Sequence, residues 1–121
     1  MLRSFSRLAL IVLFTCSCLL NAQEFRSTLA GRVVDQTGAV VVGAKVQAIE
    51  MGTNSRYETD TNSDGLYNFP LLLPGQYELR AEAKGFKTFS QQGIQVNANA
   101  RVAQEIVLAV GSTSDSVTIT S

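Results

Sequence analysis

The stretch GQYELRAEAK, from Gly75 to Lys84, has the clearest alternation of apolar and charged residues in this chain. Its apolar positions, which share one face of an extended chain, are Tyr77, Leu79, Ala81 and Ala83. Its charged positions, on the opposite face, are Glu78, Arg80, Glu82 and Lys84. A period of two residues is typical of a β-strand that buries one face and leaves the other in water. We therefore expect a strand here, with Tyr77 and Leu79 in the core and Glu78 in solvent.

Shorter segments of the same kind occur on both sides of this strand. They are Leu29–Val34, Ala44–Ala48, Tyr67–Phe69 and Val102–Leu108. Clusters of turn-forming residues separate them at short intervals, at Asp35–Gly38, Gly52–Asn54, Asn62–Gly65, Pro74–Gly75, Lys84–Gly85 and Asn97–Asn99. No long segment has a helical period. The pattern predicts an all-β protein, a single antiparallel seven-stranded β-sandwich.

The first 22 residues have the order of a secretory signal peptide. Two arginines precede an apolar run, Leu8–Leu20, which ends close to the small residue Ala22. The run is shorter than the roughly 20 residues that cross a bilayer as a helix. We therefore predict a signal peptide over residues 1–22, cleavage after Ala22, and an exported bacterial protein that begins at Gln23.

Removal of the signal peptide also removes both cysteines, Cys16 and Cys18. A lipoprotein signal ending at Cys18 is disfavoured because Thr15 occupies the position where such signals carry a bulky aliphatic residue. The mature chain then has no disulfide, and its core alone must stabilise it unless it is attached to something larger. It loses two of ten basic residues and none of the ten acidic ones, which leaves a net charge of about −2. This balance gives no basic surface for nucleic acid.

The segment Asp60–Gly65 reads D-x-N-x-D-G, the opening of a calcium-binding loop. Asp60, Asn62 and Asp64 would occupy ligand positions 1, 3 and 5, but position 12, which needs a bidentate carboxylate, is Leu71. Asn and Asp also cap turns with their own side chains, and glycine supplies a positive φ between two strands. We therefore interpret the segment as a structural turn and assign no metal site.

Two longer stretches carry a family resemblance: GRVVDQTGAVVVGAKVQA, followed by TDTNSDGLYNFPLLLPGQYELRAEAKGF. Together they resemble the carboxypeptidase regulatory-like domain, a transthyretin-like (prealbumin-like) β-sandwich found in bacterial exported and surface proteins. The matching positions of the first stretch are Gly31, Val33, Asp35, Gly38, Gly43, Ala44 and Val46. Those of the second are either Thr59 with Asp60 or Thr61, and then Asp64, Gly65, Tyr67, Phe69, Leu73, Pro74, Gly75, Tyr77, Leu79, Gly85 and Phe86. The resemblance covers about residues 27–110, and it departs at Val42, where the family often has proline.

The resemblance implies a scaffold rather than an enzyme. In the parent proteins the zinc ligands and the catalytic glutamate belong to a separate peptidase domain. The residues agree with this, because the chain contains no histidine, which excludes Ser-His-Asp and Cys-His arrangements and the usual zinc sites. We predict no catalytic residues, no metal site and no cofactor.

The two ends of the chain suggest a second resemblance. A signal peptide, one such sandwich and a segment like GSTSDSVTITS (Gly111–Ser121) resemble the start of a TonB-dependent outer-membrane receptor, in which a plug and a β-barrel would follow. We predict a sandwich over residues 23–110 and a linker over residues 111–121, with Val117–Thr120 either the first strand of a plug or an edge strand of the sandwich. The function predicted is a non-catalytic periplasmic or outer-membrane interaction or structural module, with a protein partner, from a receptor that is truncated or stands alone.

Carbohydrate binding is the alternative, because the family is similar in fold to starch-binding sandwiches. Sugar sites usually present exposed aromatic faces, and the chain has no tryptophan. We expect Tyr67, Phe69 and Tyr77 in the core. The aromatic candidates for a sugar platform are then Tyr57, Phe89 and Phe25.

Overall fold

The computed structural model describes residues 26–112 and 114–120, so the predicted signal peptide over residues 1–22 lies outside them. The described residues form strands and turns without a helix. The strands are β1 (Ser27–Asp35), β2 (Lys45–Glu50), β3 (Arg56–Asp60), β4 (Leu66–Leu72), β5 (Gly75–Glu82), β6 (Thr88–Val96), β7 (Arg101–Ala103), β8 (Ile106–Leu108) and β9 (Ser116–Thr120). Within the described part of the chain, no helix is long and apolar enough to cross a membrane.

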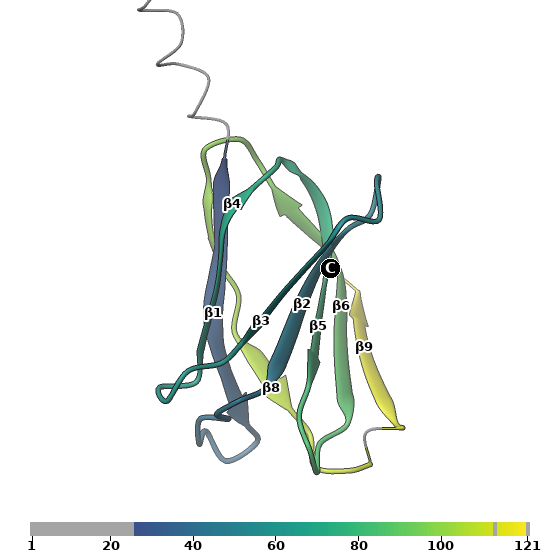
Figure 1. The fold of residues 1–121 in the computed structure, drawn as a ribbon. Helices are drawn as coiled ribbons and strands as arrows, with labels where there is room; N and C mark the ends of the chain where they lie inside the picture. The colour runs from purple at the N-terminus through teal and green to yellow at the C-terminus, as the bar shows by residue number, and fades with distance from the viewer. Residues whose placement is uncertain (1–25, 113, 121) are drawn as a thin grey trace, which may run out of the picture.

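The strands form two sheets that pack face to face (Figure 1). In the smaller sheet β4 pairs with one edge of β1, and β7 and β8 pair in succession with the other edge. The larger sheet has the order β3-β2-β5-β6-β9. The all-β two-sheet sandwich expected from the alternation is confirmed.

The strand count and the pairing differ from the expected seven antiparallel strands. The described residues form nine strands, and the pairs β1–β7, β1–β8 and β6–β9 are parallel. The predicted strand Val102–Leu108 is divided at residues 104–105, where Gln104 N donates to Ala30 O at 2.9 Å. This irregularity separates β7 from β8, and no local sequence pattern marks it.

The second additional strand is β9, which contains Val117–Thr120. Its residues pair with β6, from Thr88↔Ser116 to Gln92↔Thr120. Val117–Thr120 was expected to be either the first strand of a plug or an edge strand of the sandwich. In the structure it is part of an edge strand of the sandwich. Ser116, expected in a linker, is the first residue of β9.

The core lies between the sheets and contains the apolar positions of the alternating segments. Its largest fully buried side chains include Tyr67, Tyr77, Leu29, Leu72 and Leu79. Tyr77, Leu79 and Ala81 are each 0% exposed, as the alternation in β5 predicts. Each core tyrosine has a partner for its hydroxyl: Tyr67 Oη donates to Gln104 O, and Tyr77 Oη donates to Leu73 O at 2.6 Å. Burial therefore adds apolar area without leaving these hydroxyls unpaired.

Candidate functional site

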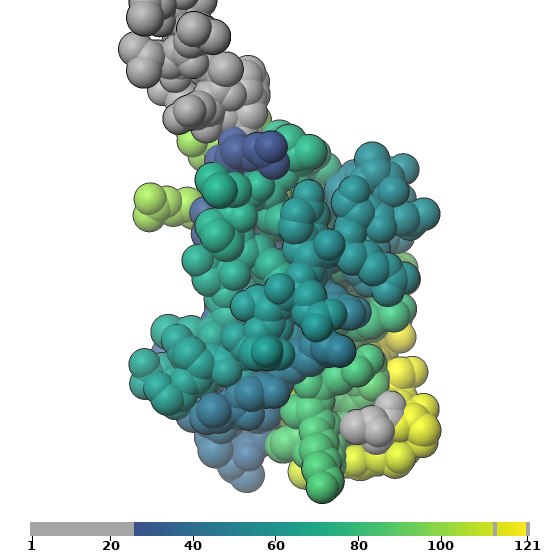
Figure 2. Space-filling model, viewed as in Figure 1, coloured from purple at the N-terminus to yellow at the C-terminus, as the bar shows by residue number. Residues whose placement is uncertain are grey.

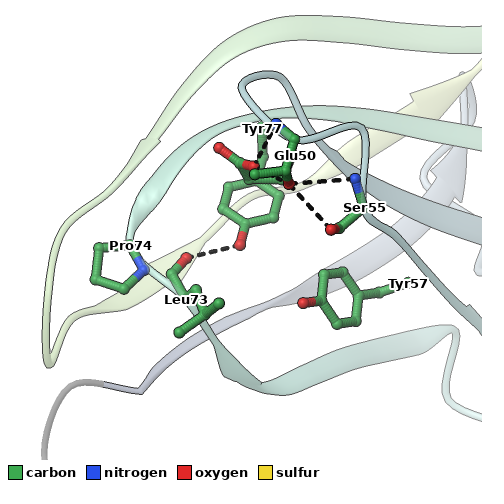
Figure 3. Close-up of a pocket in the computed structure, with 7 residues that line it drawn as sticks. Glu50, Ser55, Tyr57, Leu73, Pro74 and Tyr77 are labelled. Carbon is green, nitrogen blue, oxygen red and sulfur yellow. Dashed lines mark hydrogen bonds between the residues drawn. The ribbon is translucent and has the colours of Figure 1, made fainter.

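A small pocket opens at one end of the sandwich, where two turns meet (Figure 3). Its volume is about 190 Å³. The lining residues come from the β2–β3 hairpin and from the β4–β5 turn with β5; they are Glu50, Thr53, Ser55, Tyr57, Leu73, Pro74 and Tyr77. The rings of Tyr57 and Tyr77 both point toward Leu73. No sequence pattern marks this pocket, because its two halves are distant along the chain.

Glu50, the one carboxylate among the described residues that line this end pocket, accepts hydrogen bonds from its own hairpin. Glu50 Oε1 accepts a hydrogen bond from Gly52 N at 3.2 Å, and Oε2 accepts from Thr53 N at 2.8 Å and from the Thr53 hydroxyl. These bonds, that of the Thr53 hydroxyl first, lower the pKa of the Glu50 carboxyl below its usual value. The carboxylate therefore closes the hairpin turn.

The Asp60–Gly65 segment folds as the expected turn. Asn62 Oδ1 accepts hydrogen bonds from Asp64 N and Leu66 N, both at 3.0 Å, and Gly65 has a φ of 72°. The side-chain oxygen that would be the second calcium ligand is thus engaged by backbone N–H groups. Leu71, at the position of the bidentate carboxylate, is exposed on β4. No group of three or more acidic, cysteine or histidine side chains placed to hold a metal occurs in residues 26–112 and 114–120.

From the structure of this turn we expect that calcium does not change the stability of the protein. The two backbone bonds to Asn62 form without a metal, and the residue at position 12 supplies no carboxylate. Thermal unfolding in chelator and in excess calcium should therefore give the same midpoint. A midpoint several degrees higher with calcium would show that the loop holds the ion.

The aromatic side chains do not assemble into a sugar platform on the described surface. Tyr67 and Phe69 lie in the core as expected, at 2% and 4% exposure, with ring centroids 5.9 Å apart. Phe89, expected to be exposed, is wrong as a candidate: it is 3% exposed, because it faces the core from β6. Tyr57 packs partly buried against the core and lines the end pocket. Phe25 lies outside the described residues.

Glu78 corrects the expectation that the charged face of β5 is fully wet. It lies opposite Ile49 on β2, and it is only 8% exposed. Its Oε1 accepts hydrogen bonds from Ser90 Oγ at 2.8 Å and Arg80 Nε at 3.2 Å, and Arg80 Nη2 lies 3.2 Å away. The pairing of β5 with β6 shifts register beside this residue, between Tyr77 and Leu79. A period-two pattern cannot show such an irregularity, which is why sequence analysis missed the cluster.

Replacing Glu78 with alanine should lower the free energy of unfolding by about 1–3 kcal/mol, because Ser90, itself 7% exposed, loses its acceptor. Glu78→Gln should cost less, since the amide oxygen can still accept from Ser90. Urea denaturation measures both. Glu82→Ala, at an exposed position on the same face, is the matched control. Equal costs for Glu78→Ala and Glu82→Ala would contradict the role of the cluster.

The sequence profile of the carboxypeptidase regulatory-like domain matches residues 28–109, which span β1 to β8. The chain belongs to the carboxypeptidase regulatory-like domain family. This confirms the resemblance carried by the two quoted stretches. The family is one of regulatory-like β-sandwiches, in agreement with the two sheets described above.

One curated relative of this carboxypeptidase regulatory-like chain is the TonB-dependent transporter Oar of Myxococcus xanthus. The two are 30% identical over 83 residues, which are 68% of this chain and 8% of the transporter. The chain therefore spans a small fraction of the length of the relative that it matches. The similarity shows a distant homology to part of a TonB-dependent transporter.

Solved structures share the fold at low sequence identity. A candidate carbohydrate-binding protein from Bacteroides uniformis has a TM-score of 0.57 and 20% identity, over 69% of this chain and 41% of that chain. Hydroxyquinol 1,2-dioxygenase from Pseudomonas putida has a TM-score of 0.56 and 12% identity, over 70% of this chain and 56% of that one. At these identities the likeness is one of fold alone.

Proposed function

We propose that this carboxypeptidase regulatory-like domain is a non-catalytic interaction or structural module of the bacterial cell envelope, and that it serves as the N-terminal domain of a TonB-dependent outer-membrane receptor. The observation that carries the proposal is the 30% identity to the transporter Oar over 83 residues. The signal-peptide pattern of residues 1–22 supports export to the same compartment.

The chemistry of the described surface supports a non-catalytic role. General acid–base catalysis most often uses histidine, which the chain lacks. The carboxylates best placed to react are engaged in structure: Glu50 closes a hairpin and Glu78 bonds Ser90. Burial raises the pKa of the Tyr67 hydroxyl well above its usual value and keeps the phenol protonated. These groups stabilise the sandwich.

Fractionation of the source bacterium tests the location. An antibody against residues 27–110 should detect the domain in the outer-membrane fraction, together with an integral outer-membrane protein used as a marker. A soluble periplasmic protein is the matched control for leakage. Detection only with the soluble marker would contradict attachment to a receptor.

Carbohydrate binding is the second candidate, favoured by the likeness to the Bacteroides uniformis protein. The described aromatic side chains support it weakly, because Phe89 is buried and Tyr57 is partly buried. Titration calorimetry of the full chain with soluble starch and cell-wall oligosaccharides should give no heat of binding. A saturable signal that is lost in Tyr57→Ala would favour the sugar-binding function.

A further inference from the structure

The strand β9 is an unusual edge strand. Its five residues, S-V-T-I-T, contain no charge and no proline, and all five are exposed. Two of them are apolar: Val117 is 36% and Ile119 is 44% exposed. The strand lies at the margin of the five-stranded sheet in Figure 1 and at one side of the surface, in yellow, in Figure 2. Its outer edge is therefore open to another strand.

The other described edges carry the features that block strand addition. β3, at the opposite side of the same sheet, presents Arg56, Glu58 and Asp60. β4 contains Pro70, which has no N–H, followed by Leu71 at a φ of 64°. β7 and β8 are three residues each. Charges, proline and short length are the means by which natural sheets protect their edges, and β9 has only its short length of five residues.

The register of β9 shows which backbone groups point outward. Thr88 N donates to Asp115 O at 2.9 Å, and Thr88 pairs with Ser116 in a parallel ladder. In such a ladder alternate residues direct both N–H and C=O to the same side. Val117 and Ile119 then direct theirs to β6, while Ser116, Thr118 and Thr120 direct theirs to the open edge.

The sequence of β9 is complementary to itself around Thr118. If a second copy pairs antiparallel with Thr118 opposite Thr118, each Val117 lies opposite an Ile119 and each Ser116 lies opposite a Thr120. The outward backbone groups then form the hydrogen-bonded pairs. The apolar residues occupy the non-hydrogen-bonded pairs, where side chains approach most closely. Every pair matches apolar with apolar or hydroxyl with hydroxyl, which favours pairing.

We propose that two copies of this chain associate through β9, antiparallel and centred on Thr118, so that their five-stranded sheets join across a two-fold axis. The interface is isologous, as a two-fold axis requires. Val117 pairs with the buried Phe89 of β6, so the two side chains lie on the same, core-facing side of the sheet. In the dimer Val117 and Ile119 of both copies lie side by side on that face, across the two-fold axis. Five paired residues on each copy bury less surface than the roughly 1,200 Å² of a stable interface, so the dimer is weak. The proposal does not depend on the receptor function.

Disulfide trapping tests the register directly. The full chain, with Cys16→Ser and Cys18→Ser so that only introduced thiols remain, is made as Val117→Cys and as Ile119→Cys. In the proposed pairing the Cα atoms of these two positions lie about 4.5 Å apart, within the range of a disulfide. In a dimer of two copies of the same variant, the two cysteines are offset by two residues along the strands. Their Cα atoms then lie more than about 7 Å apart, which is too far for a disulfide. Mixing the variants in a glutathione redox buffer should therefore give about tenfold more mixed dimer than either same-variant dimer. The variants differ in mass, so intact mass spectrometry separates the three products.

Thr118→Cys should crosslink with itself, because the two-fold axis passes between the two copies of this residue. Glu58→Cys, in the middle of the charged edge strand β3, is the matched control and should remain monomeric. Ile119→Lys, added to Thr118→Cys, should abolish the crosslink while leaving the melting temperature unchanged, since residue 119 is half-exposed. Mixed dimer in no more than the twofold excess over each same-variant dimer that random pairing gives, or a monomer throughout, would overturn the proposal. A monomer would leave the edge of β9 to a strand from a different protein.

Discussion

Tyr77→Ala is expected to lower the free energy of unfolding by about 3–5 kcal/mol, the usual cost of removing a buried aromatic side chain. Tyr77 is 0% exposed, and its hydroxyl donates to Leu73 O at 2.6 Å. The substitution removes the ring and leaves that carbonyl without its donor. Leu79→Ala, on the same face of β5 and also 0% exposed, should cost about 2–5 kcal/mol.

Urea denaturation of the two variants measures these costs. Gln76→Ala, on the same strand with an exposed side chain, is the control, and it should change the free energy of unfolding by no more than about 0.5 kcal/mol. If Gln76→Ala cost as much as Tyr77→Ala, the alternation of β5 between core and solvent would be wrong.

Gly31→Ala is the other change with a large expected effect. A Cβ at residue 31 would lie 1.9 Å from Gln104 O and 2.9 Å from Tyr67 Oη. The first contact is with backbone, so rotation of a side chain cannot relieve it. The same carbonyl accepts the Tyr67 hydroxyl, and Gln104 N donates to Ala30 O. Displacing Gln104 therefore disturbs both bonds, and we expect a cost of about 3 kcal/mol, at the upper end for overpacking.

Gly38→Ala separates this steric effect from the backbone freedom of glycine. Gly38 has a φ of 89°, but a Cβ there would meet no atom within 4 Å. Its cost should be about 1 kcal/mol, from the strained φ alone. Chemical denaturation of both variants gives the comparison. A smaller cost for Gly31→Ala than for Gly38→Ala would show that the chain around Gln104 adjusts easily.

The alternation of apolar and polar residues predicted the fold because each sheet buries one face. The alternation placed Tyr77 and Leu79 in the core, and the turn-forming residues of Asn62–Gly65 placed a turn there, both from local sequence alone. Alternation did not predict the burial of Glu78, which bonds Ser90 of β6 beside a register shift between β5 and β6. Alternation did not predict the division between β7 and β8 either. At this division Gln104 bonds Ala30 and Tyr67, which are distant in sequence.

The candidate sites were less predictable than the core. The Asp60–Gly65 turn is local, so its Asn and Gly residues indicated its structure. The end pocket joins Tyr57 of one hairpin to Leu73 and Pro74 of another turn, and only the sandwich brings them together. The open edge of β9 is likewise a consequence of its pairing with β6, which is a parallel contact without a sequence signature. Both features therefore depend on contacts that alternation does not encode.

The most informative measurement is the size of the polypeptide that contains this domain in an outer-membrane fraction. Residues 27–110 can be detected by antibody after denaturing electrophoresis of that fraction, and peptides from the same band can be sequenced by mass spectrometry. We predict a polypeptide of receptor size, with the domain and the alternating strand segments of a transmembrane barrel, about ten residues each, in one chain. A small polypeptide that contains the sandwich alone, released from the membrane by salt, would contradict the account.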